Sequence, residues 1–558
     1  MRSRLTRLGR LCDTSLSRFG KHSTSCSGAR WNSSSTRQWS TPLAKTLSEV
    51  ITTTGPIPVA SYMRQCLTSD LGGYYTSKTP DRDQFGRKGD FVTSPEISQI
   101  FGELVGLWIV AEWIAQGRKD HGVYLMEVGP GRGTLMDDVM RVNVFVVVTG
   151  VPLKCMQTIR NFKDLVSALD GVYLVEASSS LREAQHKLLC GDNALTKTET
   201  GHESRSKYAS DLQVKWCEDV RLLPQESDKT PFIVAHEFFD ALPIHVFQSI
   251  APNPVGSIQT PTGPIEARNI PRAAQHQWRE LLVSPTSPYA THASLGTPKS
   301  LQAEPVPEFE LTLAKAATPH SLYLPEQSER YRRLKSTSNA IIEVSPESQT
   351  YAADFAVRIG GGKVPTPNPN QHAQSHAKRV SQPRQAEMIE KAEPFGAALI
   401  IDYGPADTIP SNSLRGIKAH KRVSPFTEPG RVDLSADVDF LALAESALEA
   451  SPGVEVHGPL DQARFLTAMG IEERATQLVK RAVDQERGAV QSARSQDRTR
   501  TDLTEIVKRI ESGWKRLVDR GPHGMGKLYQ VMAIVPYKSR AGGQPIRRPV
   551  GFGGDISI

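Results

Sequence analysis

The sequence lacks any long uninterrupted run of apolar residues. A membrane-spanning helix needs about 20 predominantly apolar residues in succession. The most apolar helical candidate in this chain of 558 residues, the segment 104–115, is interrupted by the charged residue Glu112. We therefore expect no membrane span.

Cysteine is scarce as well. Only six cysteines occur in 558 residues, and no two of them are spaced as a CxxC pair. This number and spacing disfavour a disulfide framework and a cysteine zinc site, and they suit a reducing compartment. We expect no metal site.

Glycine and proline are too few for a fibrous or wholly disordered chain. The 42 glycines and 38 prolines together make up about 14% of the residues, which is well below the share in collagen-like or low-complexity chains. A globular chain of this length is expected to contain two to four structural units, at roughly 100–200 residues each.

Acidic residues are almost absent from the first 48 positions. That segment holds nine Lys or Arg, eleven Ser and one acid, Asp13, so its net charge is +8. Arg-rich, Ser-rich and acid-poor segments are typical of mitochondrial transit peptides. We expect residues 1–48 to be such a peptide and the mature chain to start between about residues 30 and 48. A disordered basic tail is the alternative.

The rest of the chain is electrically neutral. Without the first 48 residues, 67 − 9 = 58 basic and 60 − 1 = 59 acidic residues remain, for a net charge of −1. Nucleic-acid-binding proteins need a strongly basic surface. We therefore expect no nucleic-acid partner.

Short apolar segments alternate with helical or polar ones along most of the chain. The predicted strands are 123–128, 172–176, 214–217, 232–235, 397–401 and 528–535. Strands separated in this way predict an α/β fold in which helices flank a mostly parallel sheet.

Two stretches interrupt that rhythm. Residues 251–307 contain ten prolines, and residues 360–386 are polar, so both are expected to be flexible insertions. Between and beside them, the predicted strands 278–283, 309–313 and 340–344 indicate an inserted α+β subdomain.

A glycine turn follows the first predicted strand. The segment 125–134 reads LMEVGPGRGT, so Glu127 precedes Gly129, Gly131 and Gly133 at alternate positions. A dinucleotide fingerprint, GxGxxG, does not fit because position 134 is Thr. The spacing instead resembles motif I of class I S-adenosylmethionine-dependent methyltransferases. A carboxylate beside the turn suits a cofactor that carries a sulfonium and an amino group, although a purely structural turn is the alternative.

Acids also follow the next two predicted strands. Glu176 ends the second strand and is a candidate for the ribose hydroxyls, whereas Asp219 follows the third and is a candidate for the adenine side. Since the carboxyl ends of parallel strands meet at one sheet edge, Glu127, Glu176 and Asp219 are expected to lie in one crevice with the glycine turn.

The fourth and fifth strands lead to candidates for the methyl acceptor. Glu237 and Asp240 follow the fourth strand three residues apart, and a helical turn would place them on one face. We predict that they hold a cationic acceptor; a helix start with acids at its positive end is the alternative. Asp402 and Tyr403 end the fifth strand at the same predicted sheet edge.

A helix entry upstream adds three further candidates. Ser94 is the expected N-cap of a helix that continues to about residue 116, with Pro95 in its first turn. Polar residues cluster at this entry, so Thr93, Ser94 and Glu96 are substrate-binding candidates.

A series of motifs in this order resembles a known family. They are GDFVTSPEISQIFGELVGLW, LMEVGPGRGTLMDDVMR, YLVEASSSLREAQ, AHEFFDALPIHVFQ, ALIIDYG, LRGIKAHK, PGRVDLSADVDF, GPLDQARFLTAMGI and MGKLYQV. Between about residues 48 and 537, without the insertions, the chain is similar to the mitochondrial complex I assembly factor family of protein-arginine methyltransferases, the MidA-like proteins.

This resemblance implies fold, chemistry and partner together. It implies a class I methyltransferase (Rossmann-like) fold in the mitochondrial matrix, S-adenosyl-L-methionine as cofactor, and symmetric dimethylation of an arginine. The protein substrate would be a core subunit in the iron–sulfur arm of complex I, which needs the modification for its assembly. Glu237 and Asp240 would then be the catalytic residues.

The chain departs from the family pattern at three places. His236 stands where the family usually has Asn, the proline-rich insertions are longer, and residues 142–155 interrupt an expected helix. The last segment is expected to be an exposed loop or a retained intron in the gene sequence. Two other functions stay open, namely methylation of a different substrate and a cofactor-binding assembly factor without catalysis, which His236 favours.

The predicted organisation follows from these features. It comprises a transit peptide (1–48), a helical segment capping the active site (49–120), the first part of the methyltransferase core (121–250), the insertion subdomain (251–393), the second part of the core (394–537) and a disordered tail (538–558).

Overall fold

A twisted central sheet organises the chain. The computed structural model describes residues 37–77, 84–86, 89–145, 164–223, 225–251, 258–260, 263–265, 276–363, 388–492, 499–538 and 547–554. Within these residues the central sheet has the strand order β20-β21-β16-β7-β2-β3-β6-β5-β4. The strands from β16 to β6 run parallel, whereas β21, β5 and β4 pair antiparallel with their neighbours. The predicted mostly parallel α/β sheet is confirmed.

The strand bounds agree closely with the predicted ones. The central strands are β2 (Val123–Val128), β3 (Leu169–Val175), β4 (Thr196–Lys197), β5 (His202–Arg205), β6 (Gln213–Cys217), β7 (Thr230–His236), β16 (Ala397–Tyr403), β20 (Val454–Asp461) and β21 (Tyr529–Pro536). The sequence did not predict β4, β5 and β20. β4 and β5 are short and polar, and β20 contains Gly458 and Pro459, which normally argue against a strand.

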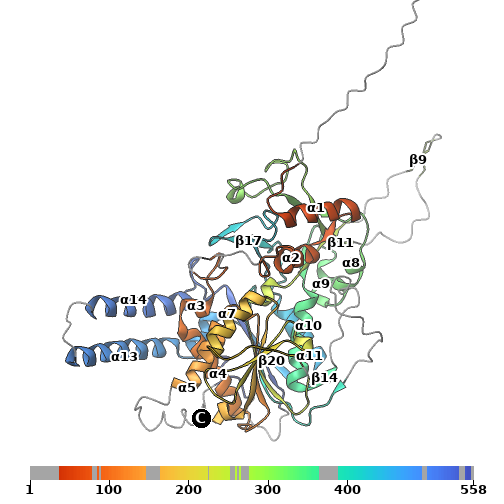
Figure 1. Cartoon of the computed structure of the whole chain (residues 1–558). Coiled ribbons are helices and arrows are strands. Elements are labelled where there is room, and N and C mark those ends of the chain that lie inside the picture. Colours follow the sequence, from red (N-terminus) through yellow and green to blue (C-terminus); the bar gives the residue numbers. More distant parts are fainter. Residues whose placement is uncertain are drawn as a thin grey trace, which may run out of the picture. The chain divides into compact units, whose positions relative to one another are not determined.

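Helices cover both faces of the central sheet (Figure 1). The helices are α1 (Pro42–Thr54), α2 (Val59–Thr68), α3 (Ser94–Ile97), α4 (Gln99–Ala115), α5 (Thr134–Phe145), α7 (Ser179–Cys190), α8 (Pro319–Tyr323), α9 (Glu329–Leu334), α10 (Pro346–Gly360), α11 (Phe440–Ala450), α12 (Gln462–Ala468), α13 (Ile471–Ser492) and α14 (Thr499–Val518). Side chains of β2 alternate between the two faces, with Leu125 packed towards α4 and α5 and Met126 towards α10 and α11. The sheet is therefore buried on both sides, as parallel sheets require.

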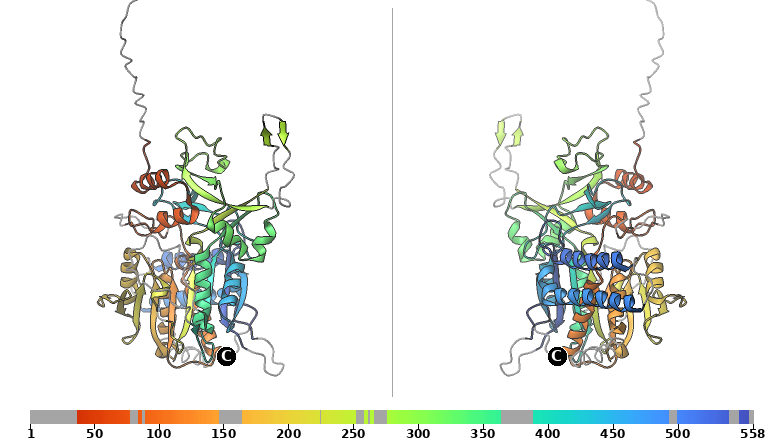
Figure 2. Two further views of the ribbon diagram at one scale, coloured as in Figure 1. Left: turned by 90° about the vertical axis from the view of Figure 1, so that its right-hand side faces the viewer. Right: turned by 90° about the vertical axis from the view of Figure 1, so that its left-hand side faces the viewer.

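A smaller module with its own core lies over the end of the central sheet (Figure 2). Its sheets are formed by β1 (Ile57–Pro58), β8 (His245–Ile250), β11 (Gln277–Pro285), β12 (Phe309–Leu313) and β13 (Ile341–Val344), and by β17 (Arg415–Lys418), β18 (Lys421–Val423) and β19 (Asp433–Ser435). The remaining strands are the pairs β9 (Ile258–Thr260) with β10 (Gly263–Ile265) and β14 (Gly362–Lys363) with β15 (Met388–Ile389). The helices α1 and α2 pack on this module, so its parts come from three distant regions of the chain.

The structure differs from the predicted domain boundaries at both ends of the described chain. α1 begins at Pro42, and Leu43 and Leu47 are buried, so the fold starts before the predicted boundary at residue 48. Most of the predicted transit peptide lies outside the described residues. At the other end, the predicted disordered tail contains an ordered segment, 547–554. Val550 is buried there, and Arg547 forms an ion pair with the buried Glu112.

The boundary of the predicted insertion also needs a correction. α10 lies within residues 251–393, yet its apolar side chains pack on the central sheet. Helix α5 continues to Phe145, and residues 146–155 of the doubtful segment 142–155 lie outside the described residues. None of the helices in the described part of the chain has the length and apolar character needed to cross a membrane.

Candidate active site

One large cavity opens where the parallel strands end. It has a volume of about 2110 Å³, and Gly129, Glu176, Glu237 and Tyr403 line it at the carboxyl ends of β2, β3, β7 and β16. Open α/β sheets bind their ligands at this edge. Residues of the smaller module line the opposite side, so the cavity lies between the central sheet and that module.

The glycine turn after β2 has a backbone that only glycine adopts easily. The φ angles of Gly129, Gly131 and Gly133 are +65°, +52° and +84°. A β-carbon at Gly129 would lie 2.6 Å from the Phe238 ring, and one at Gly131 would lie 3.4 Å from Phe85. Gly129 therefore has no room for a β-carbon, whereas at Gly131 it is the positive φ that disfavours other residues, and all three glycines let the backbone approach a ligand closely.

Glu127 offers a buried acidic group beside this turn. Its side chain lines the cavity, and its Oε2 is buried without a hydrogen-bond partner. Burial raises the pKa of the Glu127 carboxyl to about 8, against the effect of a hydrogen bond from the Met136 N–H. A cationic ligand at Oε2 would compensate for both the missing partner and the burial.

Glu176 is held in a fixed orientation at the end of β3. Its Oε1 accepts a hydrogen bond from the Ser178 N–H at 2.7 Å, and its Oε2 accepts one from the Gln185 side-chain amide at 3.0 Å. Burial raises the pKa of Glu176 to about 7, although these hydrogen bonds act in the opposite direction. The carboxyl keeps lone pairs for ligand hydroxyls, as the predicted ribose contact requires.

Asp219 follows β6 and lines the same end of the cavity. Its Oδ1 caps the following short turn by accepting the Arg221 N–H at 2.9 Å, and it also accepts the Arg221 Nε–H at 2.7 Å. Asp219 is therefore already paired, and the neighbouring Glu218 lines the cavity as well.

The predicted helix entry is present, but its capping differs from the prediction. Thr93, not Ser94, is the N-cap of α3, in a capping box with Glu96. Glu96 also lies 3.4 Å from the Arg132 guanidinium on the glycine turn. Thr93 and Glu96 line the cavity, and Ser94 is buried with an unpartnered hydroxyl.

Glu237 has the most unusual environment of the predicted site residues. It follows β7 with a φ of +50°, which is rare for a residue with a side chain and is frequent at functional sites. Its Oε1 accepts a hydrogen bond from the Ser94 N–H at 3.4 Å. Burial, with Asp240 and Asp402 nearby, raises the pKa of Glu237 well above its usual value.

Asp402 has a supporting position instead of the predicted substrate contact. It is fully buried and does not line the cavity. Its Oδ2 accepts the N–H groups of Phe238 at 3.0 Å and Phe239 at 2.7 Å, and its Oδ1 accepts the N–H of Tyr403 at 2.7 Å. It thus fixes the turn that carries Glu237.

Asp240 and Tyr403 lie at the acceptor end with residues that the sequence did not predict. Burial raises the pKa of Asp240, whereas Arg415 lowers it. The Arg415 guanidinium lies over the Tyr403 ring at 4.3 Å and pairs with Asp437. A planar cation therefore already packs against an aromatic ring beside a carboxylate at this end of the cavity.

Two more missed residues complete this end. Tyr529 begins β21, packs edge-on against Tyr403 at 5.5 Å, and donates a hydrogen bond to Glu237. Asp433 accepts a hydrogen bond from Tyr75 at 2.9 Å, and burial raises the pKa of Asp433 to about 7. Tyr529 lies in the motif MGKLYQV and Asp433 in the motif PGRVDLSADVDF. Both are far from the glycine turn in sequence, so no local pattern predicted that they line the same cavity.

His236 lies between the two ends of the cavity. Its ring packs on Phe101 with 4.9 Å between the centroids, and its Nε2 is 3.3 Å from Glu237 Oε1 without a hydrogen bond. Burial lowers the pKa of His236 to about 3, so the imidazole is neutral.

The sheet order, the glycine turn and the acid after β3 together define an S-adenosylmethionine-dependent methyltransferase. Residues 104–460 match a family described as "Putative S-adenosyl-L-methionine-dependent methyltransferase". The chain belongs to this family, and its cofactor is S-adenosylmethionine. The residues present fit that cofactor, because the buried unpartnered Oε2 of Glu127 can accept its ammonium group and the exposed turn can approach it closely.

Comparisons with individual proteins agree with this assignment. The chain is 31% identical to "Protein arginine methyltransferase NDUFAF7 homolog, mitochondrial" of Drosophila melanogaster, over 88% of this chain and 85% of the fly protein. It is 30% identical to the human protein arginine methyltransferase NDUFAF7, over 90% and 86% of the two chains. A crystal structure from Burkholderia thailandensis, bound to S-adenosyl-homocysteine, has the same fold, with a TM-score of 0.53 and 19% identity over 88% of this chain and 91% of the other.

Proposed function

We propose that this methyltransferase modifies arginine side chains of a mitochondrial protein. Relatives at about 30% identity are named as mitochondrial protein arginine methyltransferases and align over most of both chains. The basic, acid-poor residues 1–36, most of the predicted transit peptide, support import into mitochondria.

The acidic acceptor end of the cavity is the observation that carries this proposal. Arginine presents a planar cation with five N–H donors and keeps its charge at any physiological pH. Glu237, Asp240 and Asp433 supply carboxyl groups at this end, and Tyr403 supplies an aromatic face. A guanidinium would add positive charge among these buried acids, whereas a neutral acceptor would not offset the burial of their charged forms.

Glu237 is the candidate to orient the acceptor nitrogen. When bound, S-adenosylmethionine supplies a methyl group from its sulfonium. The Glu237 carboxylate would hold the guanidinium by charge-assisted hydrogen bonds, and the positive φ directs its side chain into the crevice. As the nitrogen gains the methyl group it must lose one proton, and a carboxylate whose pKa is raised by burial is suited to accept it.

The expected product and partner are more specific. We propose symmetric dimethylarginine as the product, and a core subunit of the iron–sulfur arm of complex I in the matrix as the protein substrate. The similarity of the ordered motifs to the complex I assembly factor family supports both assignments. Thr93, Glu96 and Tyr403 stay candidates for substrate contacts in this proposal, whereas the predicted contact at Ser94 does not fit, since Ser94 is fully buried and does not line the cavity.

A methyl-transfer assay tests the proposal directly. Mitochondrial extract lacking this protein would be incubated with radiolabelled S-adenosylmethionine and the recombinant protein, and labelled proteins would be hydrolysed for amino-acid analysis. The expected result is label in symmetric dimethylarginine of one complex I subunit. Label in a small molecule, or in another amino acid, would contradict the assignment.

One observation favours a second function, an assembly factor that binds the cofactor without catalysis. His236 replaces the usual Asn of the family and lies against Glu237, where it limits the space around this carboxyl group. Cofactor binding without any label transfer in the same assay would support this function.

A further inference from the structure

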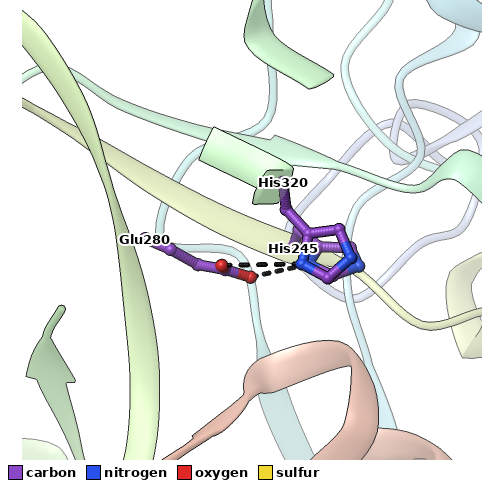
Figure 3. A group of neighbouring side chains, drawn as sticks. All are labelled: His245, Glu280 and His320. Carbon is purple, nitrogen blue, oxygen red and sulfur yellow. Dashed lines mark hydrogen bonds and ion pairs between the residues drawn. The ribbon is translucent and has the colours of Figure 1, made fainter. Parts of the chain in front are cut away.

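Two histidines and a glutamate converge in the smaller module, and none of them is among the residues assigned above to the cofactor or the acceptor. His245 comes from β8, Glu280 from β11 and His320 from α8 (Figure 3). Each side chain offers one possible metal-ligating atom, and these three atoms all lie within 4.8 Å of one another. Glu280 is fully buried and His245 nearly so, whereas the side chain of His320 is 33% exposed.

We propose that these three side chains form a binding site for a divalent transition metal ion, with Zn²⁺ as the ion that fits best. Both imidazoles turn Nδ1 towards the same carboxyl group, with His245 Nδ1 2.7 Å from Oε1 and His320 Nδ1 3.7 Å from Oε2. Two ligands at about 2.0–2.1 Å from zinc and at the tetrahedral angle are about 3.3–3.4 Å apart. His245 lies closer to the carboxyl group than this and His320 farther from it, and the three ligating atoms lie within 4.8 Å of one another, so the side chains would adjust around a bound ion.

The surroundings support this set of ligands. The Thr318 hydroxyl donates a hydrogen bond to Glu280 Oε2, and hydrogen bonds of this kind hold metal-ligating carboxyl groups in a fixed orientation. Arg64 is a cation that lines the same cavity. Its charge does not oppose a metal ion, because Arg64 forms an ion pair with Glu347. Because His245 and His320 also line the large cavity, the ion would have an open position and an entry path there.

The ligand chemistry selects the kind of ion. Two imidazole nitrogens and one carboxylate oxygen suit zinc and related transition metals better than Mg²⁺ or Ca²⁺, which prefer oxygen ligands only. The ion would join β8, β11 and α8 across the wall of the cavity. No local spacing reveals this site, because its three ligands are 35 and 40 residues apart and come from three different elements.

Direct metal binding by the full chain tests the proposal without methyl transfer. Tag-free protein would be stripped with a chelator and titrated with Zn²⁺ by calorimetry, and Co²⁺ would be added separately to record its visible spectrum. We expect one equivalent of tightly bound Zn²⁺ and the intense absorption of four-coordinate Co²⁺. His320→Gln should weaken binding about 10–100-fold while the partly exposed position keeps the fold intact.

A matched control separates this site from ordinary surface histidines. His121 lies 2.6 Å from Asp120, but both side chains are exposed, so His121→Gln should leave Zn²⁺ affinity unchanged. Glu280→Gln should also lose the Co²⁺ spectrum, with thermal unfolding as the check on its fold. Absence of stoichiometric binding, or equal affinity in His320→Gln and His121→Gln, would overturn the proposal and leave the cluster as a hydrogen-bond network.

Discussion

The two ends of the large cavity are built in different ways. At the cofactor end, Glu127 and the glycines from 129 to 133 are neighbours in sequence, and Glu176 follows the adjacent strand. At the acceptor end, Glu237, Arg415, Asp433 and Tyr529 come from segments that are separated by up to 529 − 237 = 292 residues and belong partly to the smaller module. The cofactor end is therefore a local feature of one fold, whereas the acceptor end exists only after the two modules have packed together.

The largest effect is expected at the cofactor end. Gly131→Val should weaken S-adenosyl-homocysteine binding about 100-fold or more, because the new side chain meets Phe85 and a φ of +52° strains a β-branched residue. Isothermal titration measures the affinity. Gly191→Val is the matched control, since Gly191 has a φ of +62° but no atom within 4 Å of its would-be β-carbon. The assignment is wrong if both variants bind equally well.

A smaller but more selective effect is expected at the acceptor end. Glu237→Gln should slow methyl transfer about 10–100-fold, because a charge-assisted hydrogen bond worth about 1.5–3 kcal/mol is lost with the acceptor bound. Cofactor affinity should hardly change because Glu237 follows β7 and is not part of the glycine turn after β2, and stability should hardly fall because burial, with Asp240 and Asp402 nearby, raises the pKa of Glu237 and disfavours its charged form. Single-turnover rates with labelled cofactor measure the change.

A second cavity acid provides the control for this variant. Glu218 lines the cavity and is exposed, so Glu218→Gln should transfer methyl groups at the normal rate. A normal rate in Glu237→Gln would remove Glu237 from the catalytic residues. Loss of cofactor binding in that variant would instead assign Glu237 to the cofactor end.

The contrast between the two ends explains what the sequence could predict. The strand 123–128 has the predicted bounds because a buried apolar run ending in glycines is a local signal. The packing of α10 on the central sheet was missed, because nothing local distinguishes a helix of the core from a helix of an insertion. The first half of α1, residues 42–48, was included in the leader for a related reason, since its basic and serine-rich surroundings hide a short buried face.

The same distinction applies to the site residues. Sequence reasoning placed Glu127, Glu176 and Glu237 at the cavity, because each lies at or directly after the carboxyl end of a strand of the parallel sheet. It assigned Asp402 to the substrate on the same ground, but this carboxyl group is engaged by three backbone N–H groups. Arg415 lies in the smaller module, and its contact with Tyr403 depends on tertiary packing that no local pattern reveals.

Proton release offers a third test, which concerns the cofactor end alone. The pKa of Glu127 is raised to about 8, so the free protein is protonated there at pH 7, and an ammonium group at Oε2 would favour the ionised form. Cofactor binding should therefore release a proton and tighten by up to about tenfold per unit as pH rises from 6 to 8. Burial also raises the pKa of Glu176, to about 7. A proton released by Glu176 on cofactor binding would therefore add to the pH dependence between pH 6 and 7.

Calorimetry in buffers of different ionisation enthalpy measures that proton. Glu127→Gln should lose most of the release, whereas Glu237→Gln should keep it because Glu237 belongs to the acceptor end. An unchanged pH dependence in Glu127→Gln would show that the ammonium group contacts a different residue.

The smallest effect is expected at the boundary between the two ends. His236→Asn introduces the residue that the resemblance to the assembly factor family implies at this position, and the imidazole it removes is neutral and makes no hydrogen bond through Nε2. If the protein is an arginine methyltransferase, this change should alter the rate by less than about threefold and leave cofactor affinity unchanged, since neither a charge nor a hydrogen bond is lost. Rates with the same labelled substrate measure it. The opposite result would be a wild-type protein that transfers no methyl group and a His236→Asn variant that does. It would support the assembly factor without catalysis, because the imidazole beside Glu237 would then be what blocks the acceptor.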